Sequence, residues 1–233
     1  MSELEYAVSV LLQENGYYLE VSPDIHKWNA IMRANGAFVY SHLDTRWTRH
    51  GAAEWIGIYD GKTGQIAACL AYRVLENANF LEMFEDGRIY ADLPEQWGHT
   101  FHDTGLRGLI DTAGSRIVSR GGIHSFIRGK ALSFYACTLA VAKAVELDAD
   151  ISAGIILPGT PLPREWYGYW MFCDTTEHKW PNLESSMRAT IGWSGKRQLR
   201  EEANRRTELL QAAKYDDLKT AASTYSRHYH AGK

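Results

Sequence analysis

Residues 116–157 constrain the fold more than any other part of this sequence. Residues 116–124 have strand character, residues 128–147 predict a long helix rich in alanine and leucine, and residues 151–157 form a second apolar strand. Strand, tight turn, helix and strand in this order make a βαβ-like unit, although the sequence leaves the strand directions open. We therefore expect an α/β or α+β fold.

The turn that leads into the long helix has the properties of an anion site. The first turn of a helix carries unsatisfied N–H groups and the positive end of the helix dipole. Gly129, Ala131 and Ser133 are small enough to let a phosphate approach that backbone, and Arg128 and Lys130 add positive charge beside it. The turn is therefore predicted to bind phosphate groups. Neither a P-loop motif nor a dinucleotide-binding Gly-x-Gly-x-x-Gly motif occurs here.

The run Arg128-Gly129-Lys130-Ala131-Leu132-Ser133 resembles the pyrophosphate loop of the GNAT superfamily of acyl-CoA N-acyltransferases, whose pattern is Gln/Arg-x-x-Gly-x-Gly/Ala. Arg128 matches the first position, whereas Ala131 and Ser133 replace the family's small residues with other small residues. The resemblance runs loosely over residues 17–175. It implies a GNAT-like mixed twisted sheet flanked by helices, and coenzyme A as the carrier of an acyl group, acetyl being the commonest.

The resemblance also implies candidates for the chemistry. In the family a backbone N–H near the end of the fourth strand polarises the thioester, which maps to Ile123 or His124. His124 is also a candidate base, and Tyr167 or Tyr169 could protonate the departing thiolate. The plainer alternatives are a histidine hydrogen-bonded at a strand end and two core tyrosines. The predicted contacts to the cofactor are Ile123, His124, Arg128, Gly129, Lys130, Ala131, Leu132 and Ser133.

The N-terminal half supplies a helix at 2–14, a strand at 17–21 and a helix from Ser22 to Ala34, with Ser22 as the cap. Two β-rich runs at 54–60 and 65–75 flank a glycine-bearing link and predict an antiparallel hairpin. A second hairpin at 80–92 and a partly helical segment at 93–113 follow. The carboxylates that could bind or deprotonate a cationic acceptor are Glu54, Glu76 and Glu82, with solvent exposure as the plainer interpretation.

The C-terminal segment, residues 196–233, carries nine basic and five acidic residues and predicts helix. We expect a GNAT-like domain over 1–195 and a helical extension over 196–233. An apolar stripe is formed by Leu199, Ala203, Leu210, Ala213, Leu218 and Ala221. The alternative function is a non-catalytic binding module that acts through a basic helix face, with a solvated face as the plainer interpretation. The basic cluster consists of Arg197, Arg200, Arg205 and Arg206.

Composition narrows the remaining classes. The 233 residues are 45% hydrophobic, which supports a packed core, and the net charge of −3 argues against nucleic acid as a partner. Aromatic residues make up 12% and gather at two places, which suggests cavity walls. One place is the run 166–172, and the other lies around the hairpin, at Trp47, Trp55, Tyr59 and Tyr72.

The expected environment is cytoplasmic, because the N-terminus lacks a signal-peptide pattern and the most apolar run, 134–145, is too short to span a membrane. We expect no membrane partner, a small-molecule or peptide amine as substrate, and leave a homo-oligomer open. Three widely spaced cysteines, Cys69, Cys137 and Cys173, predict buried thiols. A metal site is not expected, because the cluster His99, His102 and Asp103 lacks a further ligand at a recognised spacing.

Overall fold

A computed structural model describes eight stretches of the chain: residues 1–37, 39, 43–45, 52–79, 115–174, 178–179, 186–213 and 217–231. Several sequence predictions fall outside the described residues. They are the hairpin at 80–92, the segment 93–113, Trp47, Glu82, and the cluster of His99, His102 and Asp103.

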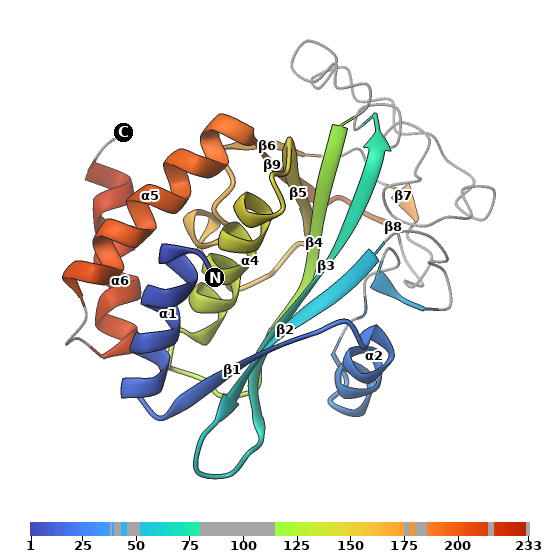
Figure 1. Cartoon of the computed structure of the whole chain (residues 1–233). Coiled ribbons are helices and arrows are strands. Elements are labelled where there is room, and N and C mark those ends of the chain that lie inside the picture. Colours follow the sequence, from blue (N-terminus) through green and yellow to red (C-terminus); the bar gives the residue numbers. More distant parts are fainter. Residues whose placement is uncertain are drawn as a thin grey trace.

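A seven-stranded mixed sheet forms the centre of the molecule, in the order β1-β2-β3-β4-β5-β9-β6 (Figure 1). All neighbouring strands in it are antiparallel except β4 and β5, which run parallel. The strands are β1 (Tyr17–Ser22), β2 (Ala52–Asp60), β3 (Ile66–Ala78), β4 (Ser115–Ser125), β5 (Ile151–Ile156), β6 (Met171–Asp174) and β9 (Thr190–Gly195), with β7 (His178–Lys179) and β8 (Ser186–Met187) forming a separate pair. The helices are α1 (Glu3–Glu14), α2 (Ile25–Ala34), α4 (Leu132–Glu146), α5 (Lys196–Ala212), α6 (Leu218–Ala231) and the short 3-10 helix η3 (Arg164–Tyr167).

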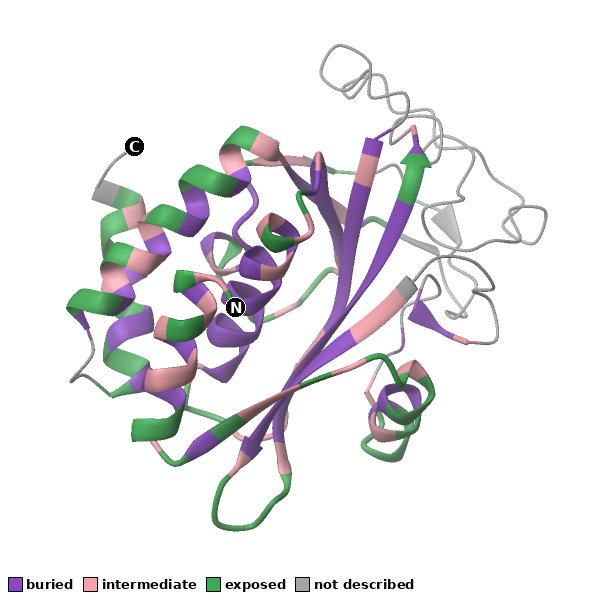
Figure 2. Ribbon diagram, viewed as in Figure 1, coloured by how far each residue is buried: buried purple, intermediate pink, exposed green. Residues whose placement is uncertain are grey.

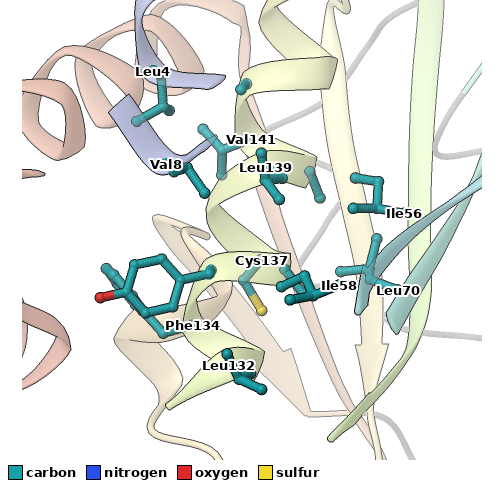
Figure 3. Packing of buried hydrophobic residues seen from close by; sticks show 14 of the residues in the cluster. Leu4, Val8, Ile56, Ile58, Leu70, Leu132, Phe134, Cys137, Leu139 and Val141 are labelled. Carbon is teal, nitrogen blue, oxygen red and sulfur yellow. The ribbon is translucent and has the colours of Figure 1, made fainter. Parts of the chain in front are cut away.

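Helices cover the two faces of the sheet unequally. The helices α1, α4, α5 and α6 gather on one face, and α2 lies on the other (Figure 1). The buried residues of α4 and those of the central strands form a core between this helix and the sheet (Figure 2). Leu139 and Val141 of α4 share this core with Ile56, Ile58 and Leu70 of β2 and β3 (Figure 3). On the opposite face a smaller cluster joins α2 to the alternate side chains of the same strands. We call these the α4 face and the α2 face.

Most predicted elements are confirmed, and two helix starts are wrong. The helix α2 begins at Ile25 and is capped by Asp24, whose Oδ1 accepts the N–H of Lys27 at 2.9 Å, whereas Ser22 ends β1. The helix α4 begins at Leu132 rather than at 128, because the loop before it contains backbone that no α-helix accommodates. The hairpin β2–β3 and the strands β1, β4 and β5 lie where the sequence predicts them.

The C-terminal segment folds as two helices that pack on the main core. The predicted apolar stripe is buried, and its members belong to the same cluster as α4. The helix α5 contacts both α1 and α4. The domain boundary at residue 195 stays a prediction. Within the described stretches, none of the helices combines the length and the apolar character needed to cross a membrane.

Candidate active site

The strands β4 and β5 pair over four residues and then part. Parallel pairing runs from Ile117 opposite Ile151 to Arg120 opposite Gly154, whereas β4 continues to Ser125 on the other side of the gap, paired with β3. A bulge in β4 accompanies this divergence. Between its pairs with Cys69 and Ala71, β3 has one residue and β4 has two. Because a bulge bends its strand and increases the twist, it directs β4 away from β5.

Gly122 makes this bulge possible. Its φ is +60°, in the left-handed region where a side chain is strained. A Cβ at this position would lie 2.2 Å from Cζ2 of Trp28, a fully buried side chain of α2. The backbone of β4 therefore lies so close to Trp28 of α2 that only glycine fits at this position.

The loop after β4 positions the N-terminus of α4 next to the end of β4. Gly129 has φ +77° and Ala131, the N-cap residue, has φ +55°. Ala131 stands where the GNAT loop pattern has glycine, and its left-handed backbone gives a physical reason for that preference. No side chain caps α4 in the described structure. Its first N–H groups are therefore available to an anion, with Arg128 beside them.

A cleft of about 810 Å³ lies along this loop. Seven of the eight predicted cofactor contacts line it, namely Ile123, His124, Arg128, Gly129, Ala131, Leu132 and Ser133. Lys130 is exposed and is not among the lining residues. It lies near the start of α6, where Asp217 has a pKa that is lowered first by the Thr220 hydroxyl and, more weakly, by the charge of Lys130.

Apart from Trp166, which belongs to the predicted aromatic run at 166–172, the opposite wall of the cleft comes from residues that the sequence did not mark. It consists of Thr160, Pro161, Leu162, Trp166, Lys219 and Ser223. The hydroxyl of Tyr135, on α4, donates to the carbonyl of Leu218 at 2.8 Å and so fixes the start of α6 against α4. Lys219 adds a second cation to the phosphate end.

A smaller cavity of about 20 Å³ lies where β4 and β5 part. Ile123 and Thr160 line both this cavity and the cleft, so the two adjoin. Arg120, Tyr167 and Tyr169 line it as well. Both tyrosines are buried, and their parallel rings lie 6.1 Å apart.

A pair of glycines makes room for Tyr169. Gly154 of β5 and Gly192 of β9 lie directly opposite each other in the sheet. A Cβ on Gly154 would lie 2.1 Å from the Tyr169 hydroxyl, and one on Gly192 would lie 2.2 Å from its ring. Burial raises the pKa of Tyr169, and the positive charge of Arg120 partly opposes this shift. The phenol therefore keeps its proton at neutral pH.

His124 lies on the other side of β4 from the tyrosines. It pairs with Cys69, whose side chain belongs to the α2-face cluster, and its ring lies 4.6 Å from that of Phe126. Tyr169, in contrast, belongs to the α4-face core. Partial burial lowers the pKa of His124, so the imidazole is neutral at pH 7. The structure thus places a neutral base candidate on the α2 face of the sheet and two phenols on the α4 face.

The remaining candidates lie elsewhere. Glu54 accepts a hydrogen bond from the hydroxyl of Tyr72, and Glu76 accepts from Nε of Arg116 at 2.8 Å. Neither lines the cleft. Within the described part of the chain, no cluster of three or more metal-ligating side chains occurs. Cys69 and Cys137 are buried thiols, as predicted.

The basic residues of α5 do not form a common exposed face. Arg206 is fully buried and donates from Nε to Glu202 at 2.6 Å. Arg205 also bonds Glu202, and Arg200 bonds Asp148 at 3.0 Å. The alternative of a basic surface made by all four arginines is therefore not supported, and the solvated face of the plainer interpretation does not include Arg206.

A mixed sheet whose fourth and fifth strands run parallel and then part, with a helix N-terminus at the mouth of the gap, is a GNAT-like fold. No known family model matches the sequence, and no curated protein matches it. The chain is similar to several solved structures. FeeM, an N-acyl amino acid synthase from uncultured soil microbes, is 13% identical, with 81% of this chain and 97% of that chain covered and a TM-score of 0.49.

NAA60 of Arabidopsis thaliana, in complex with acetyl-CoA, is 6% identical over 77% of this chain and 98% of that chain, with a TM-score of 0.45. The acyl-homoserine lactone (AHL) synthase LasI is 11% identical over 75% of this chain and 88% of that chain, with a TM-score of 0.40.

Proposed function

We propose that this protein is an acyl-CoA-dependent N-acyltransferase, which transfers an acyl group directly from coenzyme A to an amine. One observation carries the proposal: the cleft at the open N-terminus of α4 adjoins, at Ile123 and Thr160, the small cavity in the gap between β4 and β5. A ligand with phosphates at one end and a reactive thioester at the other fits such a cleft. Acetyl-CoA is the first donor to test.

The phosphates of the donor would bind the first N–H groups of α4, with Arg128 and Lys219 neutralising their charge. Ala131 and Gly129 keep the backbone accessible there. The pantetheine arm would follow the cleft past Trp166 towards Ile123.

The transfer itself would take place in the gap. The amine nitrogen attacks the thioester carbonyl carbon, so that a C–N bond forms and the C–S bond breaks. A backbone N–H of β4 near Ile123 would stabilise the charge on the carbonyl oxygen. His124, neutral at pH 7, would take the proton of an amine that arrives from the α2 face, and Tyr169 or Tyr167 would protonate the thiolate on the α4 face.

Calorimetric titration with coenzyme A and acetyl-CoA tests the proposal. We expect one binding site per chain. Arg128→Gln should weaken binding of both ligands about tenfold or more, because it removes a charged partner of the phosphates. Arg197→Gln makes the same change of charge at an 85% exposed side chain of α5 that does not line the cleft, and should leave affinity unchanged. No binding at millimolar ligand would refute the proposal.

A further inference from the structure

Arg120 is a buried cation with unused hydrogen-bonding capacity. The residue is 3% exposed and lines the small cavity. Its guanidinium carbon lies 4.2 Å from the ring centroid of Tyr169, a cation–π contact. Within the part of the chain that the structure describes, Nε and Nη2 of Arg120 have no hydrogen-bond partner.

The other buried arginine of the α4 face shows how this fold satisfies such a group. Arg206 donates from Nε to Glu202, from Nη1 to Thr138, and from Nη2 to the carbonyls of Glu165 and Trp166. A guanidinium cannot lose its proton, so burial without partners is costly. Arg206 is bonded through all three of its nitrogens, whereas Arg120 leaves two unbonded beside a cavity.

The geometry of the two unbonded nitrogens determines which chemical group could accept hydrogen bonds from both. Nε and Nη2 share one edge of the planar guanidinium, where two N–H bonds run parallel. This edge matches the two oxygens of a carboxylate in a bidentate pair. A hydrocarbon group in the same place would leave both donors unsatisfied and bury the charge against apolar surface.

The position of the cavity determines which part of a ligand reaches it. Arg128 and Lys219, the proposed phosphate partners, line the cleft alone, whereas the cavity adjoins the cleft at Ile123 and Thr160. A volume of about 20 Å³ holds one small polar group. The group that meets Arg120 therefore belongs to the reacting end of a substrate.

We propose that Arg120 binds a carboxylate carried by a substrate of the transfer reaction. This inference rests on the proposed function. The carboxylate can come from two sources: the far end of a short acyl group, as in a dicarboxylic acyl-CoA, or an amino acid that serves as the amine acceptor. Both present the same pair of oxygens to the guanidinium.

Pairs of isosteric donors test the first source. Calorimetry compares malonyl-CoA with isovaleryl-CoA and succinyl-CoA with 4-methylvaleryl-CoA, which differ in replacing two carboxylate oxygens by methyl groups. We expect one carboxylated donor to bind at least about tenfold more tightly than its isostere. In Arg120→Met this preference should disappear, while binding of bare coenzyme A stays unchanged.

Pairs of acceptors test the second source. Turnover with acetyl-CoA compares amino acids with the corresponding amines that lack the carboxylate. If the carboxylate comes from the acceptor, the amino acid is preferred, and Arg120→Met raises its KM towards that of the amine with little effect on the amine itself. Arg200→Met, which changes a 60% exposed arginine outside the cleft, is the matched control and should preserve either preference.

Two further measurements keep the test decisive. Melting curves establish that Arg120→Met is folded, and Arg120→Lys, which keeps the charge but loses the planar fork, should retain only part of the preference. If coenzyme A binds and neither donors nor acceptors with a carboxylate are preferred, the assignment of Arg120 is overturned and the proposed function stands. If coenzyme A does not bind, the proposed function fails, and this inference fails with it.

Discussion

The backbone of Ala131 permits a quantitative test of the phosphate loop. Its φ of +55° and ψ of 23° place a residue with a side chain in the left-handed region at the start of α4. This conformation costs an L-residue about 1 kcal/mol that glycine does not incur. Ala131→Gly should therefore raise the free energy of unfolding by about 1 kcal/mol, which corresponds to about 2–4 °C in melting temperature for a chain of this length.

The opposite change should damage both stability and binding. A β-branched residue is a severe outlier at positive φ, so Ala131→Val should lower the free energy of unfolding by about 1–3 kcal/mol. Its methyl groups would also enter the cleft that Ala131 lines and weaken coenzyme A binding. Ala131→Gly should leave this affinity intact.

Differential scanning calorimetry and ligand titration measure the two effects separately. Ala140→Gly is the control, because Ala140 is buried in the interior of α4, where glycine costs about 1 kcal/mol. The two glycine substitutions should therefore shift the melting temperature in opposite directions. A lower melting temperature for Ala131→Gly, or unchanged coenzyme A affinity in a folded Ala131→Val, would refute the loop geometry.

Three further predictions follow from other parts of the site. Gly122→Ala should lower the free energy of unfolding by about 2–4 kcal/mol in urea titration, because the new methyl group combines left-handed strain with a clash against Trp28. Arg206→Met should cost about 3–5 kcal/mol by leaving the buried Glu202 carboxylate without its main partner, and the added substitution Glu202→Leu should recover most of this loss. His124 should titrate below 6.5 in an NMR experiment, because burial lowers its pKa. Since the folded-state pKa is the lower one, its contribution to stability is full above pH 6.5 and declines as the pH falls below that value, and His124→Asn should abolish this decline.

The sequence predicts those helices and strands that short local patterns mark. A glycine-bearing link between two β-rich runs marks the hairpin β2–β3, and the apolar run at 151–157 marks β5. The start of α4 was misplaced because helix propensity favours Arg128 and Lys130, whereas the positive φ of Ala131 arises from the loop's closure onto the core. An alanine in the sequence does not indicate a positive φ, so this conformation could not be predicted.

Only the site residues that are neighbours in the sequence could be predicted. The loop residues come from one motif, but Thr160, Lys219 and Ser223 reach the cleft through tertiary packing, and no spacing links them to it. Arg120 was also missed. A signal did exist, since Arg120 is a charged residue two positions after the pair Ile117 and Val118 in the same strand, and a charge in an apolar strand indicates either a buried pair or a ligand.

The C-terminal helices affect the cleft as well as the stability of the fold. Arg206 donates to the carbonyls of Glu165 and Trp166, and the indole Nε1 of Trp166 donates to Oγ of Ser226 at 2.9 Å. These bonds hold η3 between α5 and α6, and Trp166 in turn lines the cleft. Because Lys219 on α6 lines it too, a change in the packing of α6 would shift both the aromatic wall and the second cation of the phosphate end. Affinity for coenzyme A should therefore depend on residues that the GNAT loop motif does not include.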